Sequence, residues 1–232
     1  MKKIFLIAIV AALSLSACDD ETSKDVSYIT TYATMKLNDS KDLFWQMNTP
    51  FVDPGCTAFE GTINLADKVV VTSDVNATEY GKYSIAYSAK NSDGFTAGIS
   101  RNVYVCETAG VMNGVYTSNI VRDNAGTVTK RGPFKVVIYG VADGNYAITD
   151  LIGGWYDLGG GYGPTYAGSA VIKLNVDNTL SVVSADAMAW GYPCEFTSGT
   201  TSTYDPIAKT LVLHTNMEDL PDMKFTVTLT KN

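Results

Sequence analysis

Glycines and aromatic residues are concentrated in residues 153–168 of the chain. Seven of these sixteen residues are glycine and four are aromatic, and a second aromatic group, Trp190-Gly191-Tyr192-Pro193, follows in another expected loop. An aromatic ring can stack on the C–H face of a sugar, while nearby carboxylates accept hydrogen bonds from its hydroxyls. We therefore predict a carbohydrate-binding platform of six rings and two acidic partners: Trp155, Tyr156, Tyr162, Tyr166, Trp190, Tyr192, Asp150 and Asp157.

The same aromatic residues also fit a structural role. They could plug one end of a β-barrel or cover a contact between domains, with the glycines allowing close backbone approach. The spacing of the glycines does not match the dinucleotide-binding pattern G-x-G-x-x-G, and no helical pattern follows them. Both interpretations stay open at this point.

Catalytic chemistry has little support in the sequence. A glycosidase needs two carboxylates at a defined separation, and no spacing selects a pair among Asp150, Asp157, Asp186 and Glu195. The one histidine, His214, lies in an alternating strand pattern without a G-x-S-x-G nucleophile motif, and one histidine excludes a multi-histidine zinc site. We expect a non-catalytic protein that uses no metal and no cofactor.

Composition narrows the class of partner. The 232 residues carry a net charge of −7, and only 18% of them are charged. Without residues 1–17, which contain two lysines, 15 basic and 24 acidic side chains remain, which gives −9. An acidic chain lacks the basic surface that nucleic-acid binding requires, so we expect no nucleic-acid partner.

The N-terminus has the pattern of an export signal. A basic Met1-Lys2-Lys3 precedes an apolar run, Ile4–Leu15, that is too short to span a membrane. The sequence Leu15-Ser16-Ala17-Cys18 resembles the lipobox of bacterial lipoproteins, which implies cleavage of residues 1–17 and lipidation of Cys18. A cleaved soluble signal with a coincidental cysteine is the alternative.

Residues 18–26 begin with the lipobox cysteine and continue as a polar, acidic segment, which is predicted to be a tether. Acidic residues at this position resemble the surface-export signal of Bacteroidota lipoproteins, whereas in enterobacteria an Asp there indicates retention in the inner membrane. We expect a lipid anchor in the outer membrane, a surface-exposed chain, and no other membrane-spanning segment.

The first domain is predicted over residues 27–107. Period-two alternation of apolar and polar residues is clear in Lys82–Ala89 and Ile99–Val105, and no segment has a helical period. Two further strands are expected at Asp42–Met47 and Val69–Thr72. Short strands at this spacing predict an immunoglobulin-like (Ig-like) β-sandwich.

Four motifs in this domain resemble the bacterial Ig-like family named after pesticidal crystal proteins. They are Phe51-Val52-Asp53-Pro54-Gly55-Cys56-Thr57-Ala58, Gly81-Lys82-Tyr83-Ser84-Ile85-Ala86-Tyr87-Ser88-Ala89, Asn91-Ser92-Asp93-Gly94 and Arg101-Asn102-Val103-Tyr104-Val105. Asn91 departs from the usual Asp of the family. The resemblance implies a spacer or presentation module without catalytic residues.

Three cysteines remain besides Cys18, so at least one thiol is left without an intramolecular partner. The Ig-like resemblance places Cys56 and Cys106 at the same end of the domain and suggests a disulfide between them. Three small buried thiols are the alternative. The absence of a C-x-x-C pair argues against a zinc knuckle.

The second domain is predicted over residues 110–232 as an antiparallel eight-stranded β-barrel or β-sandwich. The turn signals Asp143-Gly144 and Asp177-Asn178 separate alternating runs. The expected strands are Val115–Val121, Phe134–Val141, Tyr146–Ile152, Ala170–Val176, Leu180–Ala185, Glu195–Tyr204, Thr210–His214 and Lys224–Thr230.

The whole layout of lipobox, Ig-like domain and all-β domain resembles small surface lipoproteins encoded beside glycan-uptake systems of Bacteroidota. The resemblance implies an accessory protein that captures a polysaccharide or oligosaccharide, or that joins an outer-membrane transporter complex. The alternative is a structural or adhesive surface protein whose domains contact other proteins.

Overall fold

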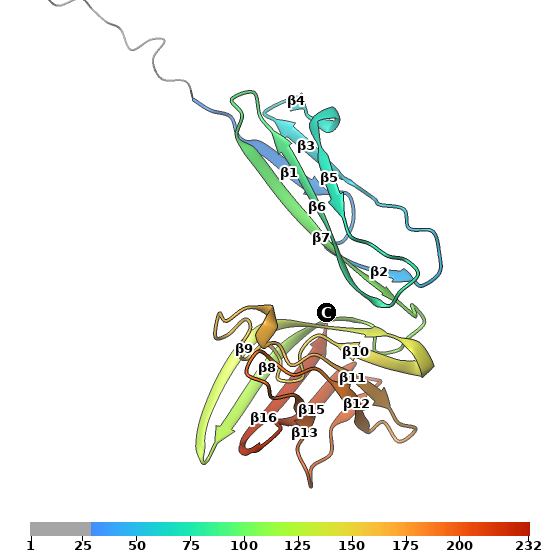
Figure 1. Cartoon of the computed structure of the whole chain (residues 1–232), viewed down its shortest axis with the longest axis vertical. Coiled ribbons are helices and arrows are strands. Elements are labelled where there is room, and N and C mark those ends of the chain that lie inside the picture. Colours follow the sequence, from blue (N-terminus) through green and yellow to red (C-terminus); the bar gives the residue numbers. More distant parts are fainter. Residues whose placement is uncertain (1–28) are drawn as a thin grey trace, which may run out of the picture.

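A computed structural model of the chain describes residues 29–232. The predicted signal peptide, Cys18 and the whole predicted tether lie outside the described residues. The described part is built from β-strands and a few short 3-10 turns, and it forms an elongated N-terminal domain that stands on a wider C-terminal domain (Figure 1). Within residues 29–232, no helix is long and apolar enough to cross a membrane.

The N-terminal domain is a sandwich of two sheets, which confirms the predicted Ig-like fold. One sheet has the order β1-β3-β4 and the other β2-β7-β6-β5, in which β2 and β7 run parallel. The strands are β1 (Ala33–Leu37), β2 (Asp42–Gln46), β3 (Cys56–Glu60), β4 (Ile63–Asn64), β5 (Val70–Ser73), β6 (Gly81–Lys90) and β7 (Thr96–Cys106). The alternation read in the sequence sends Ile85, Tyr87, Val103 and Val105 into the core.

The Asp-Pro-Gly turn before β3 holds a buried arginine in place. Gly55 adopts a φ of 72°, and its N–H donates to Asp53 Oδ1 at 3.0 Å. The Tyr87 hydroxyl donates to the same oxygen, and Arg101 Nη1 lies 3.8 Å from it. Asp53 therefore caps the turn and supplies the counter-charge for Arg101, which is fully buried.

The expected disulfide between Cys56 and Cys106 is absent, and Cys56, Cys106 and Cys194 are free thiols. Cys56 begins β3 next to Gly55, whose carbonyl accepts a hydrogen bond from Arg101 in β7. Cys56 therefore lies in the sheet β1-β3-β4, whereas Cys106 ends β7 in the other sheet of the sandwich.

The C-terminal domain is a nine-stranded antiparallel sheet that curls into a nearly closed barrel, one of the two expected architectures. Its main path is β12-β11-β10-β9-β8-β16-β15-β13, and β14 pairs with β15. The strands are β8 (Gly114–Asn124), β9 (Thr127–Gly140), β10 (Asn145–Ile148), β11 (Ala170–Leu174), β12 (Leu180–Ala185), β13 (Cys194–Phe196), β14 (Thr203–Asp205), β15 (Thr210–Met217) and β16 (Leu220–Lys231).

One core fills the interior of this barrel. It is formed by apolar side chains from every part of the sheet, among them Tyr116, Ile138, Ile172, Leu213 and Val227. Inward and outward residues alternate along β16, as its sequence predicted. The single strand expected over Glu195–Tyr204 is wrong, because the chain leaves the sheet after Phe196 and returns only at Thr203.

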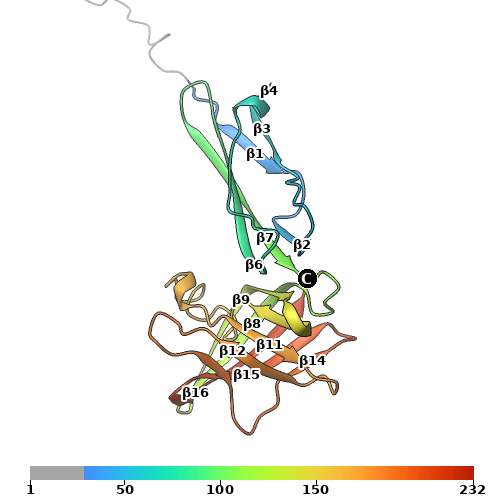
Figure 2. The same cartoon turned by 45° about the vertical axis from the view of Figure 1, so that its right-hand side comes forward.

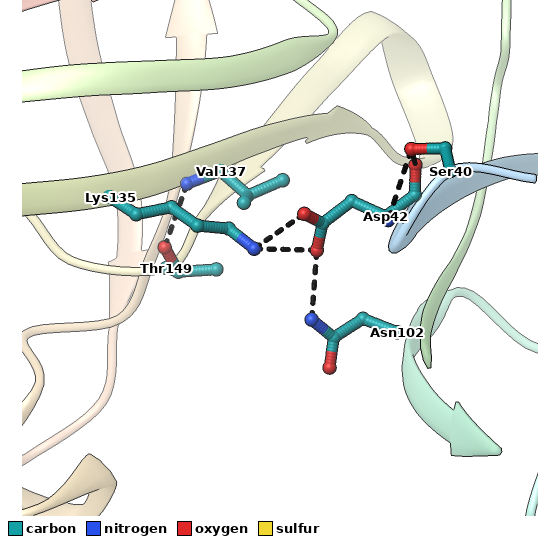
Figure 3. A network of polar contacts seen from close by, with 6 residues as sticks. All are labelled: Ser40, Asp42, Asn102, Lys135, Val137 and Thr149. Carbon is teal, nitrogen blue, oxygen red and sulfur yellow. Dashed lines mark hydrogen bonds and ion pairs between the residues drawn. The ribbon is translucent and has the colours of Figure 1, made fainter. Parts of the chain in front are cut away.

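The two domains contact each other through polar side chains, some of which are drawn in Figure 3, and through aromatic side chains. Lys135 Nζ on β9 lies 2.6 Å from both carboxylate oxygens of Asp42 on β2, and Asn102 Nδ2 donates to that carboxylate at 2.8 Å. Beside this ion pair, the Tyr104 ring packs against Tyr139 of the other domain at a centroid distance of 5.3 Å.

Glu107 fixes the short connection between the domains. Its carboxylate accepts hydrogen bonds from Gln46 Nε2 and from the Tyr80 hydroxyl, both in the Ig-like domain. Its backbone N–H donates to the carbonyl of Gly140 at the end of β9. The linker residue is thus bonded to both domains.

Candidate functional site

The glycine-rich segment connects β10 to β11 at the end of the C-terminal domain that lies nearer the Ig-like domain (gold to orange in Figures 1 and 2). Asp150 closes this loop at its base. Its carboxylate accepts backbone N–H bonds from Ile152 and Gly154 at 2.8 Å and from Gly168 at 3.1 Å. Burial raises the pKa of the Asp150 carboxyl to about 7, against the lowering effect of these three donors.

The prediction that Asp150 contacts a ligand is therefore wrong. The residue is 3% exposed, and its two oxygens are used to join the two ends of the loop. A carboxylate held by backbone donors inside a loop shapes the binding surface but does not belong to it.

The prediction that Trp155 is part of an exposed binding platform is also wrong. Its ring is 1% exposed and packs edge-on against Phe225 at a centroid distance of 5.8 Å. Gly153 and Gly154, with φ values of 73° and 94°, turn the chain inward before it. A Cβ on Gly153 would lie 2.4 Å from Ser118 Oγ, so only glycine permits this approach. Trp155 belongs to the barrel core and anchors the loop.

Four of the remaining rings gather at the surface, and we call them the aromatic patch: Tyr156, Tyr162, Tyr166 and Trp190. Trp190 is at its centre, with ring centroids 4.8 Å from Tyr156, 5.7 Å from Tyr162 and 4.7 Å from Tyr166. Trp190 is 41% exposed and Tyr162 is 58% exposed. The structure therefore brings together rings from two loops that are more than twenty residues apart in the sequence.

Tyr192 follows Trp190 in the second loop and is 36% exposed. Within residues 29–232 its ring stacks on no member of the patch, so it lies near the patch without being part of its packing. Its backbone carbonyl accepts a hydrogen bond from Met188, which closes the loop that carries Trp190.

A cleft of about 360 Å³ lies beside the aromatic patch, between the two domains. Asp157, Pro164, Ser169 and Asp186 line it from the C-terminal domain, and Lys82 lines it from β6 of the Ig-like domain. Neighbouring residues of one loop serve both features, since Tyr156 and Tyr166 are in the patch while Asp157 and Pro164 face the cleft. Patch and cleft thus form one continuous candidate site.

Asp157 is the predicted polar partner that the structure does place in the cleft. Its Oδ1 atom is buried and has no hydrogen-bond partner within the described residues. Burial raises the pKa of its carboxyl, and the nearby Lys82 ammonium lowers it. Asp186, on the same cleft, accepts a hydrogen bond from Ser169 Oγ at 2.8 Å. The cleft therefore offers acceptors to a ligand that carries hydroxyl groups.

Sequence reasoning missed Lys82 and Tyr139, which also line the cleft. Lys82 has only the sequence signature of an outward-facing residue in an alternating strand, and nothing in the sequence shows which domain it faces. Its place in the site depends on how the two domains dock, and no local pattern encodes that.

Of the residues considered for catalysis, Asp157 and Asp186 line the cleft, whereas Glu195 and His214 do not. Glu195 accepts a hydrogen bond from Asn216 Nδ2 at 2.7 Å and does not line the cleft. His214 lies in β15, where its Nδ1 is 3.4 Å from Thr226 Oγ1. Among residues 29–232, no three His, Cys, Asp or Glu side chains come close enough to hold a metal ion.

Two family models match the chain, one for each domain. The model described as a bacterial surface protein Ig-like domain matches residues 35–105, and a model for a C-terminal domain matches residues 107–231, which is more than half of the chain. No protein with a curated description matches the chain.

The lipoprotein BT2262 from Bacteroides thetaiotaomicron is similar to this chain in structure, with a TM-score of 0.67 and 26% sequence identity. The match covers 86% of this chain and 100% of that one. A structure from Clostridium perfringens ZmpB, containing CBM51-2 in complex with GlcNAc and INT domains, gives a TM-score of only 0.29 at 17% sequence identity. That match covers 85% of this chain and 43% of that one. The chain belongs to the family whose C-terminal-domain model matches residues 107–231, and it joins that domain to a bacterial surface Ig-like domain over residues 35–105.

Proposed function

We propose that this lipoprotein captures polysaccharide or oligosaccharide at the outer-membrane surface without cleaving it. The observation that carries the proposal is the contiguity of the aromatic patch with a polar cleft. Exposed rings of Trp190 and Tyr162 offer apolar faces, and Asp157 and Asp186 offer hydrogen-bond acceptors a few residues away.

This arrangement can bind both the apolar C–H face of a sugar and its hydroxyl groups. The C–H face of a pyranose stacks on an exposed ring, which buries apolar surface without requiring a charge. Its hydroxyls donate to the carboxylates that line the cleft, Asp157 and Asp186, while the Lys82 ammonium donates to a neighbouring sugar oxygen. A carboxylate and an ammonium side by side suit adjacent hydroxyl groups, which are both donors and acceptors.

The proposed anchor explains why binding without catalysis is useful. Lipidation of Cys18 with two or three chains gives lasting membrane attachment, because each buried CH₂ contributes about 0.8 kcal/mol. The acidic tether and the Ig-like domain then hold the C-terminal domain away from the membrane. A captured glycan at that distance can be passed to an outer-membrane transporter, which we propose as the partner.

Glycan arrays and affinity gels on residues 19–232 test the proposal. Trp190→Ala and Tyr162→Ala should each weaken glycan retardation at least tenfold while leaving the melting temperature nearly unchanged. Tyr32→Ala is the matched control, because Tyr32 is an exposed ring, 64% accessible, that packs against Phe95 in the Ig-like domain. Its removal should not alter retardation.

The rival role has a distinct outcome. If the chain binds no glycan on the array and instead co-purifies with one defined surface protein, the structural or adhesive function replaces glycan capture. Retention of glycan binding by both patch variants would show that the sugar binds elsewhere on the chain.

A further inference from the structure

One face of the Ig-like sheet carries both Lys82, which lines the cleft, and Asp42, which forms the ion pair between the domains. Lys82 in β6 is paired with Tyr104 in β7, and directly paired residues of neighbouring strands point to the same face. Asp42 in β2 is paired with Asn102, two residues before Tyr104, so its side chain is on this face as well. The ion pair and the cation of the cleft are therefore held by the same rigid sheet.

This face of the sheet docks on β9 of the C-terminal domain. Tyr104 alternates with the core residues Val103 and Val105, so its ring points out of the sandwich, yet it is only 1% exposed. The ring of Tyr139 in β9 packs against it at a centroid distance of 5.3 Å. Lys135 lies four residues before Tyr139 and shares its face of β9, which places the ion pair about 13 Å further along the strand.

The third contact between the domains is at the linker, where the Glu107 N–H donates to the carbonyl of Gly140. Gly140 directly follows Tyr139, so the linker and the ring contact lie together and form one pivot. A polar interface permits relative motion of two domains unless a contact away from the pivot opposes it. The ion pair at Lys135 is that contact (Figure 3).

Lys82 and Asp157 line the cleft from opposite domains without touching each other. No ion pair within residues 29–232 includes Lys82. Burial raises the pKa of the Asp157 carboxyl and the Lys82 ammonium lowers it, so the two charges interact across the gap. A ligand hydroxyl between them can donate to the carboxylate and accept from the ammonium.

We propose that Asp42 and Lys135 are positioning residues of the saccharide site, because their ion pair holds Lys82 over the cleft opposite Asp157. The assignment to a saccharide rests on the proposed function, whereas the placement of Lys82 does not. Neither member of the ion pair lines the cleft, so both act through the orientation of the domains. By linkage, a ligand that contacts both domains favours the docked orientation in return.

Zero-length cross-linking tests the placement of Lys82 without a ligand. A carbodiimide joins an amine to a neighbouring carboxylate through an amide, and peptide mass spectrometry of residues 19–232 measures the products that join Lys82 to Asp157 or Asp186. Lys135→Met and Asp42→Asn should each lower this yield about two- to fivefold, as expected for loss of a partly exposed ion pair. Lys135→Arg, which keeps the ion pair, should retain the yield.

Lys90→Met is the matched control for removal of a lysine charge. Lys90 lies eight residues beyond Lys82 in β6, about 26 Å along the strand. It does not line the cleft. Its removal should leave the cross-link yield unchanged.

Affinity gels that contain soluble starch, xylan or mannan test the same coupling in the saccharide site. On a gel that retards the unmodified chain, Lys82→Met and Lys135→Met should each reduce retardation about two- to fivefold. In the Lys82→Met background, Lys135→Met should cause no further loss, because the ion pair acts through Lys82. A purely structural role of the ion pair would make the two losses additive.

The two proposals fail in different ways. The positioning role is overturned if the unmodified chain gives no Lys82 product, or if both ion-pair variants give the same yield as the unmodified chain. Additive losses on the gels overturn action through Lys82. Yields that fall as expected, combined with gels and an array that show no glycan binding, support the placement of Lys82 and reject its assignment to a saccharide site.

Discussion

Lys135 and Asp42 form the ion pair that joins the two domains, with the ammonium 2.6 Å from each carboxylate oxygen (Figure 3). The Asp42 side chain is 12% exposed and the Lys135 side chain is 40% exposed. The carboxylate is also held by Asn102 of its own domain, so it is already oriented before Lys135 reaches it. The pair therefore fixes orientation between the domains more than it adds stability.

A double-mutant cycle with Asp42→Asn and Lys135→Met should give a coupling free energy of about 0.5–1 kcal/mol, the range for partly exposed ion pairs. The same variants should broaden the distribution of distances between spin labels placed on the two domains. Raising the salt concentration should reduce the coupling. An unchanged distance distribution would show that the aromatic contact between Tyr104 and Tyr139 suffices to hold the domains.

The two tryptophans of the predicted platform should respond oppositely to truncation. Trp155→Ala removes a buried ring from the core and should lower the free energy of unfolding by about 3–5 kcal/mol. Trp190→Ala removes a partly exposed ring and should cost less than about 1 kcal/mol. Denaturant unfolding of both variants measures the difference, and equal losses would contradict the burial described above.

Asp150 should make stability depend on pH in an unusual direction. Its folded-state pKa of about 7 lies above its ordinary value of 3.8, so the folded state binds the proton more tightly than the unfolded state does. The resulting stabilisation is complete below about pH 4 and is lost as the pH rises to 7, at up to about 1.4 kcal/mol per pH unit.

Asp150→Asn removes this titration while keeping one acceptor oxygen for the backbone donors. Denaturant unfolding between pH 5 and 8 should show the stability of the unmodified chain falling relative to that of the variant. A difference between the two that is independent of pH would mean that the three N–H donors keep the carboxylate ionised throughout.

The three described cysteines should differ in how fast their thiols are alkylated. Burial raises the pKa of Cys106 to about 11, and it also raises the pKa of Cys56 and Cys194. Native alkylation at pH 8 should be slow and should reach Cys56 first, because Cys106 and Cys194 are fully buried. Denaturation without reductant should then give three adducts on residues 19–232 by intact mass. A species that accepts only one adduct would reveal a disulfide.

Alternation in the sequence was a reliable guide to the strands. It located β6, β7 and β16 to within a few residues, because each has one face in a core and one face toward solvent. It failed over Glu195–Tyr204, where a run of Thr and Ser has strand propensity but Gly199 adopts a φ of 75° and the chain forms a loop.

The candidate site was harder to predict than the fold. Trp155 and Trp190 both stand beside glycines in loops, and no local signal distinguishes the ring that enters the core from the ring that stays outside. Their difference depends on the approach of Gly153 to Ser118, a contact between residues 35 positions apart. The Lys82 side of the cleft depends on domain docking, which local patterns do not record.

The parallel pairing of β2 with β7 has a mechanical consequence. The chain enters the Ig-like domain at the end far from the C-terminal domain and leaves it from β7 into the C-terminal domain (Figure 1). Tension between a membrane anchor and a glycan held by the C-terminal domain would pull along these strands. Their five paired positions, from Asp42 with Asn102 to Gln46 with Cys106, would then be loaded in shear and would have to break together rather than unzip one at a time. The parallel pair of strands thus gives the Ig-like domain resistance to force along its length, which the proposed capture of a glycan by an anchored protein requires.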